Sequence, residues 1–227
     1  MITIKNIEGF TDAYPDQVKG TNEWYYCKQY RGSARDLCQV IGIIEEDGRY
    51  PGSTCKLIHY PDGKVYQPFE MKADRYIEEP VYDNGKIAFL VVDFGKRRIE
   101  VYHFLPKEEE LVLLAEVPLE RNEDCDQLNI KTAPLMLCRD NFYKSKFEII
   151  WPEKKEISVG AKERIMFGDG DTLFMKEWEL LPETGYHEYV VVRDRNTGEV
   201  RERFSGSMSH MPDGSYWKIK TVDKGFE

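Results

Sequence analysis

A turn recurs at nearly equal intervals along this chain, each time between two segments rich in β-branched and aromatic residues. Three of the turns contain Pro61, Pro106 and Pro152, which lie 45 and 46 residues apart, and a fourth turn contains Asn196 and Gly198. Proline presets the backbone dihedral φ of the first turn position, whereas glycine and asparagine permit the positive φ that a chain reversal needs. The pattern predicts a series of antiparallel β-hairpins.

Strand-like segments fill most of the remaining sequence, and helical patterns are weak. No segment of about 12 or more residues combines apolar residues at helical spacing with a capping residue at each end. Sixteen segments are predicted to be strands: residues 23–29, 37–44, 55–60, 64–71, 79–82, 86–94, 99–104, 111–118, 134–138, 146–151, 156–161, 164–167, 172–180, 188–192, 199–204 and 215–220. We therefore expect one all-β antiparallel domain over residues 1–227.

The repeat spacing of about 44 residues is typical of a four-stranded propeller blade, so the architecture resembles that of β-propellers. At this spacing the chain holds about five blades, with residues 211–220 starting the last one. Residues 1–7 are expected to supply the strand that closes it, because open sheet edges invite aggregation. The blade signatures of named propeller families are absent. Because the first halves of the repeats are uneven in length, a two-sheet β-sandwich is the alternative.

The chain is acidic, with 41 Asp and Glu against 32 Lys and Arg and a net charge of −9. An acidic surface repels phosphate groups, so nucleic acid is not an expected partner. No apolar run approaches the ~18 residues of a membrane span, and the N-terminus lacks the apolar segment of a secretion signal. We therefore expect a cytoplasmic protein without a membrane partner.

The cysteines and histidines indicate neither a metal site nor a cofactor. His59 and His103 hold matching places in successive hairpins, and the third hairpin has Ile150 there. A position that accepts isoleucine or histidine indicates packing and not metal binding. No pair of cysteines has the C-x-x-C spacing, and all five are predicted to be reduced and structural: Cys27, Cys38, Cys55, Cys125 and Cys138.

Acidic residues in and near the connections between repeats form the one pattern that suggests catalysis. Glycoside hydrolysis uses two carboxyl groups about 5–10 Å apart, one of which has a raised pKa. The candidate catalytic residues are Glu79, Asp93 and Asp126. Solvated acidic loops would explain the same residues without any catalysis, so both interpretations stay open.

Two groups of adjacent aromatic residues are candidates for a ligand-contact surface. Successive side chains of a strand point to opposite faces, so at least one ring of each group is expected to reach solvent. The candidate ligand-binding residues are Trp24, Tyr26, Tyr216, Trp217 and the nearby His210. Exposed rings stack on sugars and anchor protein partners, whereas a core-filling role would leave them buried.

These patterns favour a non-catalytic binding module for a glycan or a protein ligand. The alternative is a compact glycosidase-like hydrolase that uses paired carboxylates. Fold resemblance by itself supports neither, since one fold hosts many functions. The two hypotheses differ in what they require: a pair of nearby carboxylates for the enzyme, and an exposed aromatic surface for the binding module.

Overall fold

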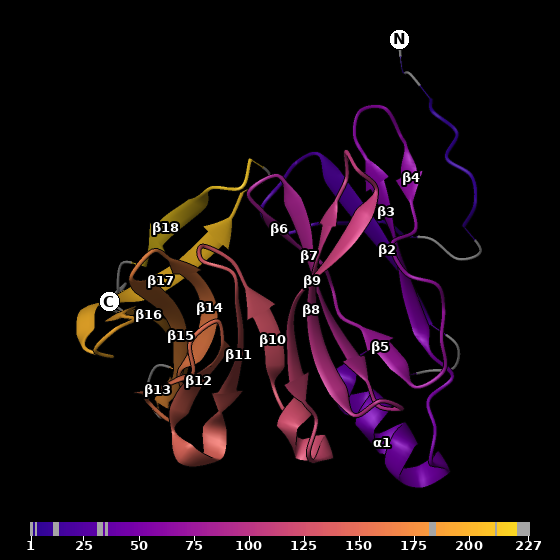
Figure 1. Cartoon of the computed structure of the whole chain (residues 1–227). Helices are drawn as coiled ribbons and strands as arrows, with labels where there is room; N and C mark the ends of the chain where they lie inside the picture. Colours follow the sequence, from indigo (N-terminus) through magenta and orange to yellow (C-terminus); the bar gives the residue numbers. More distant parts are fainter. Residues whose placement is uncertain are drawn as a thin grey trace. The chain divides into compact units, whose positions relative to one another are not determined.

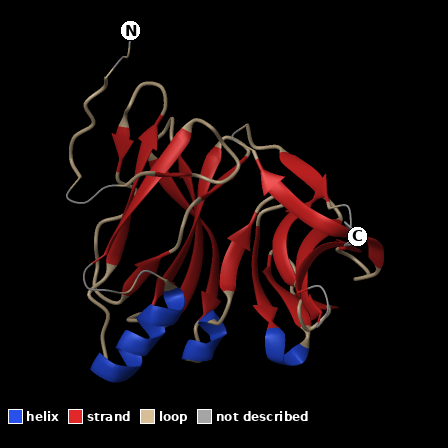
Figure 2. Ribbon diagram, turned by 180° about the vertical axis from the view of Figure 1, so that it is seen from behind, coloured by secondary structure: helices blue, strands red, loops and turns tan. Residues whose placement is uncertain are grey.

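The computed structural model describes residues 2, 4–10, 14–30, 34, 36–181, 185–211 and 213–221. Strands dominate this part of the chain, and helices are few and short (Figures 1 and 2). Contacts divide the chain into two compact units, Met1–Cys125 and Asp126–Glu227. Each unit contains two antiparallel sheets and a core of its own.

In the first unit, each sheet is a meander of strands that follow one another in sequence. One sheet has the order β1 (Asp16–Gln17), β2 (Trp24–Tyr30), β3 (Ser53–His59) and β4 (Val65–Tyr66). The other consists of β5 (Arg75–Ile77), β6 (Val81–Asp83), β7 (Lys86–Asp93), β8 (Arg98–Leu105) and β9 (Glu110–Pro118). Strands β5 and β6 pair with successive parts of the same edge of β7.

The second unit repeats this plan. Its first sheet has the order β10 (Leu128–Lys131), β11 (Met136–Asn141), β12 (Lys146–Trp151) and β13 (Lys155–Ser158). Its other sheet, called the fourth sheet below, has the order β14 (Arg164–Asp169), β15 (Thr172–Leu181), β16 (Gly185–Asp194), β17 (Val200–His210) and β18 (Tyr216–Lys220).

The predicted fold class, an all-β antiparallel fold built from propeller-type blades, is confirmed. The four turns identified in the sequence are the β3–β4, β8–β9, β12–β13 and β16–β17 connections, which join the third and fourth strand positions of four successive sheets. The number of blades is therefore four, not about five. The count differs because β18 pairs with β17 and extends the fourth sheet, and does not begin a fifth one. Four separate sheets also exclude the two-sheet sandwich.

The strand predicted for residues 1–7 does not form in the described residues 2 and 4–7; residues 1 and 3 lie outside the described part. Lys5 and Ile7 instead lie against the β3–β4 turn of the first unit. The Lys5 ammonium donates to the carbonyl oxygen of Pro61 at 3.0 Å, and Ile7 lies close to Gly63. The expectation of a closing N-terminal strand was therefore wrong for these residues.

Residues 37–44, predicted as a strand, belong to helix α1 (Leu37–Asp47). Asp36 caps its start by accepting a hydrogen bond from the Gln39 N–H at 2.9 Å, and Gly48 ends it with φ of 74°. The buried face includes Leu37 and Val40 at helical spacing. The segment is only 11 residues long, so its helical pattern in the sequence is short. Every other predicted strand overlaps an observed one.

Each core consists of side chains from both sheets of its unit. The first core contains Trp24, Tyr26, Leu57, Ile77, Ile87, Phe89, Val91 and Phe104 among others. The second contains Met136, Cys138, Phe147, Ile149, Ile165, Leu173, Met175 and Val191 among others. Burial of apolar area of this extent is the main stabilising term in such sheets. None of the described helices combines the length and the apolar character needed to traverse a bilayer.

Candidate functional site

Asp93, a catalytic candidate from the sequence, is buried at the end of β7. One carboxylate oxygen accepts a hydrogen bond from the Lys96 N–H at 2.9 Å, and the other lies 3.3 Å from the Lys72 ammonium. One oxygen therefore holds the β7–β8 turn in place, and the other pairs with the segment that precedes β5. This engagement favours a structural role for the carboxylate.

Glu79, the second candidate, is exposed and lies between β5 and β6. Its carboxylate is 3.4 Å from the Lys19 ammonium and contributes to the raised pKa of Tyr26. Along the edge of β7, Asp93 pairs with Arg75, whereas the backbone next to Glu79 bonds three residues earlier, about 10 Å away along the strand. The described contacts thus bring Glu79 to Lys19 and not to Asp93.

Asp126, the third candidate, is exposed and is the first residue of the second unit. Neither Glu79 nor Asp93 belongs to this unit. Within either unit, the described contacts therefore unite no two of the three candidate carboxylates.

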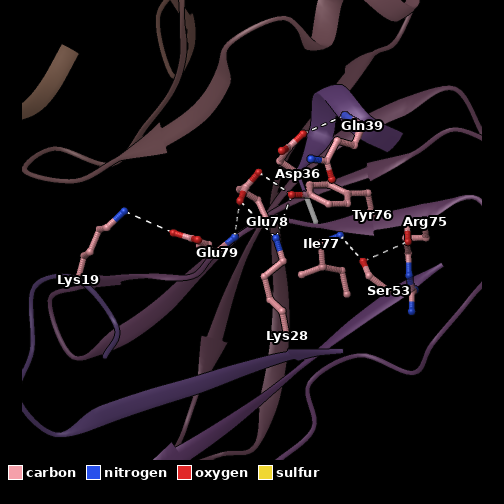
Figure 3. Close-up of polar contacts among 10 residues, drawn as sticks. All are labelled: Lys19, Lys28, Asp36, Gln39, Ser53, Arg75, Tyr76, Ile77, Glu78 and Glu79. Carbon is pink, nitrogen blue, oxygen red and sulfur yellow. Dashed lines mark hydrogen bonds and ion pairs between the residues drawn. The ribbon is translucent and has the colours of Figure 1, made fainter. Parts of the chain in front are cut away.

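A polar arrangement beside Glu79 in the first unit consists of Lys28, Tyr76 and Glu78 (Figure 3). We call it the Lys28–Tyr76–Glu78 cluster. The Lys28 ammonium donates to the Tyr76 hydroxyl at 2.9 Å, and that hydroxyl donates to Glu78 at 2.9 Å. The same ammonium lies 3.5 Å from the other oxygen of Glu78, which also accepts the Glu79 N–H. Strands β2 and β5 supply the lysine and the tyrosine.

Burial decides the protonation of the Tyr76 hydroxyl. Burial raises the pKa of Tyr76 far above its usual range, and the neighbouring Glu78 carboxylate raises it further. Burial, followed by Glu79, likewise raises the pKa of Tyr26. Both phenols therefore keep their protons at neutral pH and act as donors. Because the Glu78 carboxylate balances the charge of the Lys28 ammonium, the arrangement is an internal ion pair that joins the two sheets of this unit.

Trp24 and Tyr26, candidates for ligand contact, lie in the core of the first unit. The Trp24 ring lies 4.6 Å from the ring of His59 and 5.5 Å from that of Tyr66, measured between centroids. The expectation that these two side chains form a contact surface was therefore wrong. Alternation along β2 places them on the inner face, and the intervening Tyr25 is partly exposed.

The histidines of the first unit pair with carboxylates in turns and strands. His103 is buried, with Nε2 2.9 Å from Asp83, and His59 lies 3.0 Å from Asp62. Burial lowers the pKa of His103, against the opposing effect of Asp83. Among the residues that the structure describes, no three His, Cys, Asp or Glu side chains gather as metal ligands. All five cysteines are free thiols, and only Cys38 is exposed.

The C-terminal aromatic group lies at the surface, and its members differ in how far they are covered. Tyr216 stacks on Phe167 with ring centroids 3.6 Å apart, and His210 contacts Tyr216 edge-on at 5.0 Å. Trp217, the next residue of β18, is 62% exposed. Of the candidate ligand-binding residues, Trp217 is therefore the most accessible.

The fourth sheet carries seven of the thirteen large apolar side chains that are exposed in the described part of the chain: Trp178, Leu180, Tyr186, Val200, Tyr216, Trp217 and Ile219. Exposed apolar side chains that gather on one sheet mark a candidate interaction surface. Of these seven, only Tyr216 and Trp217 were candidates from the sequence. A signal for Trp178 and Leu180 was present, because they alternate with Glu177 and Glu179 in an unusually long strand.

Trp178, Leu180 and Tyr186 share one face of the β15–β16 hairpin, and we call them the hairpin platform. Leu180 pairs directly with Tyr186, and Trp178 lies two pairs further along the hairpin, opposite Glu188. The rings of Trp178 and Tyr186 are inclined by only 19°, with centroids 6.4 Å apart. Their side chains are from 39% to 70% exposed, with Leu180 the most exposed.

Polar groups border the hairpin platform. The Lys162 ammonium lies 5.2 Å from the centre of the Trp178 ring, within cation–π range. Tyr186 donates its hydroxyl proton to Glu188 at 2.9 Å, and Glu188 pairs with Lys176 at 2.5 Å. The hydrogen bond from Lys176 lowers the pKa of Glu188, so this carboxylate stays ionised. The result is an apolar aromatic surface with fixed hydrogen-bonding groups at its border.

No known protein family matches the sequence, and no curated protein is similar to it. The function of the hairpin platform is therefore inferred from its geometry alone.

Proposed function

We propose that this protein is a non-catalytic glycan-binding module and that the hairpin platform is its contact surface. The observation that carries this proposal is the exposed, nearly parallel pair of Trp178 and Tyr186 rings. The C–H groups on one side of a pyranose ring are weakly positive, and they pack against the negative face of an aromatic ring. Two exposed, nearly parallel rings suit two consecutive sugar residues.

The border of the platform supplies what sugar hydroxyls need. Lys162, Lys176 and Glu188 provide charged donors and acceptors within reach of the rings. A few polar groups around an apolar surface fix the orientation of a ligand and provide specificity. Lys162 adds a positive charge, which favours sugars that carry a carboxylate or sulfate group.

A hydrolase at this surface is disfavoured. Glycoside hydrolysis needs a carboxylic acid with a raised pKa near a second carboxyl group. Glu188 has a lowered pKa, and Glu177 and Glu179 project from the opposite face of β15 by alternation. Binding without turnover is therefore the function that these groups support best.

The test is a glycan array of neutral and acidic oligosaccharides, followed by calorimetric titration of every glycan that is retained. Trp178→Ala and Tyr186→Ala are each expected to weaken binding about tenfold or more, the effect of removing one dominant contact residue. Tyr143→Ala is the matched control, because Tyr143 is also highly exposed and lies outside the hairpin.

Two outcomes would contradict the proposal. One is an array on which the wild-type protein retains no glycan. The other is equal affinity of wild-type protein and Trp178→Ala for a retained glycan, which would place the site elsewhere. If the array is silent but both platform variants lose a co-purifying protein that Tyr143→Ala keeps, the ligand is a protein.

A further inference from the structure

Strand β18 forms one edge of the fourth sheet. Strand β17 pairs with β16 up to Ser205 and with β18 from Gly206 onward, so its second half and β18 form a two-stranded ribbon. Within the described part of the chain, β17 is the single strand that pairs with β18. All five residues of β18 are exposed.

The hydrogen-bonding pattern shows which backbone groups face the open edge. Thr221 donates its N–H to the Ser205 carbonyl, and Met211 donates its N–H to the Ser215 carbonyl. In an antiparallel pair these bonds involve every second residue. The N–H and C=O groups of Tyr216, Lys218 and Lys220 therefore point away from β17, toward the open edge.

The side chains of β18 differ between its two faces. Trp217 and Ile219 lie on one face and are 62% and 44% exposed. Lys218 and Lys220 lie on the other face, where their ammonium groups are 2.6 Å and 3.8 Å from Glu202. A single carboxylate thus serves two lysines, which leaves this edge with an excess of positive charge.

A second copy of this chain does not fit the edge well. An antiparallel pair of β18 strands centred on Lys218 would place two Lys218 side chains directly opposite each other, and like charges in that position are destabilising. Lysines on an edge strand are a common protection against self-pairing. The same lysines would attract a strand of opposite charge.

We propose that the open edge of β18 binds an extended peptide strand of another protein in which acidic and apolar side chains alternate. The peptide backbone pairs with the outward groups of Tyr216, Lys218 and Lys220, as in other cases of strand addition. Its acidic side chains face Lys218 and Lys220, and its apolar side chains cover Trp217 and Ile219. This site is independent of the hairpin platform and does not depend on glycan binding.

The probe is a fluorescently labelled peptide, acetyl-Thr-Glu-Val-Glu-Val-Glu-Thr-amide, whose binding to the full chain is followed by anisotropy. Lys218→Pro and Lys218→Ala form a matched pair of variants. Both remove the charge, but only proline removes the outward N–H and leaves the bonds to β17 intact. We expect Lys218→Pro to bind about fivefold more weakly than Lys218→Ala, the effect of one lost hydrogen bond.

Two further peptides test the proposal on the unaltered protein. A peptide with N-methylated glutamates lacks the N–H groups that would pair with the backbone of Lys218 and Lys220. It is therefore expected not to bind. A peptide with lysine in place of each glutamate keeps the alternation, reverses the charge, and is also expected not to bind. Saturable binding of either peptide at the affinity of the acidic one would overturn the proposal, as would no binding of the acidic peptide. If light scattering shows a dimer that Lys218→Pro dissociates, the occupant of this edge is a second copy of the chain and not a peptide of another protein, which would also overturn the proposal.

Discussion

At the residue scale, the Lys28–Tyr76–Glu78 cluster is the most consequential polar feature of the first unit. A charged lysine between two sheets costs desolvation energy unless a partner of opposite charge compensates it. Glu78 supplies that partner, and the buried Tyr76 hydroxyl joins the two groups. The cluster therefore fixes how β2 and β5 face each other, and its members differ in what they contribute.

Neutralising Glu78 should lower the free energy of unfolding more than removing the Tyr76 hydroxyl. Tyr76→Phe leaves the Lys28 and Glu78 charges together, so we expect a loss of about 1 kcal/mol in the free energy of unfolding. Glu78→Gln removes the carboxylate from a largely buried ammonium, so we expect about 2–3 kcal/mol. Urea unfolding measures both, with Glu116→Gln of an exposed ion pair as control, expected within about 0.5 kcal/mol of wild type. A larger loss for Tyr76→Phe than for Glu78→Gln would contradict this account.

The buried tyrosines should make the protein sensitive to alkali. Burial raises the pKa values of Tyr26, Tyr50 and Tyr76, and it raises the pKa of Tyr102 to about 12, with Glu100 contributing. Above about pH 10 the unfolded chain loses phenolic protons that the folded state keeps. The folded state then binds more protons, so the free energy of unfolding falls as pH rises, whereas below that pH these groups cause no such loss.

Urea unfolding at a series of pH values checks this expectation. For each buried tyrosine the slope approaches about 1.4 kcal/mol per pH unit well above pH 10. Tyr76→Phe should therefore show a shallower decline than the wild-type protein. Identical slopes for the two proteins would mean that Tyr76 titrates normally.

At the element scale, the path of β17 shows how one residue redirects a strand. Gly206 has φ of +134°, where side chains are rarely tolerated, and it lies where β17 changes its partner from β16 to β18. A Cβ atom at this position would lie 2.0 Å from the Ile219 carbonyl oxygen. The ribbon, and with it the exposure of Trp217, therefore depends on a glycine here.

Gly206→Ala should disrupt the ribbon. We expect a loss of about 3 kcal/mol in the free energy of unfolding, because the backbone strain and the contact with Ile219 act together. Hydrogen exchange of the Trp217 and Ile219 amides should accelerate at the same time. Gly170→Ala is the control: Gly170 also has positive φ, +56°, but open space around it, so about 1 kcal/mol is expected. Equal effects of the two substitutions would show that the close approach to Ile219 is unimportant.

At the scale of the whole molecule, the cysteines report on burial in both units at once. Cys27, Cys55 and Cys125 are buried in the first unit and Cys138 in the second, whereas Cys38 is exposed on α1. Burial raises the pKa of the Cys138 thiol to about 12, and it also raises those of Cys27 and Cys55. Because the thiolate is the reactive form, exclusion from solvent and a raised pKa both protect these thiols from modification.

A thiol-reactive chromogenic reagent should therefore modify one cysteine rapidly in the native protein and all five in denaturant. Cys38→Ser should abolish the rapid phase and leave the other four reactive in denaturant. Rapid modification of two or more thiols in the native Cys38→Ser protein would mean that one of the cores opens readily.

The hairpins are the part of this protein that the sequence determines by itself. Turn chemistry is local: Pro61, Pro152 and Gly198 restrict or extend φ within a few residues, so the β3–β4, β12–β13 and β16–β17 connections could be located without knowledge of the remaining fold. The cap at Asp36 and the glycine at Gly48 were equally local signals for α1, and its short length hid them.

Tertiary structure alone decided how many sheets form and which aromatic rings reach solvent. β18 resembles the start of another repeat in sequence, but its pairing with β17 is a long-range choice made by backbone hydrogen bonding and by the bend at Gly206. Trp24 and Trp217 occur in similar local contexts, yet the facing sheet of the first unit buries Trp24, whereas Trp217 projects from an edge strand. Burial depends on what packs against a strand, and that partner is distant in sequence.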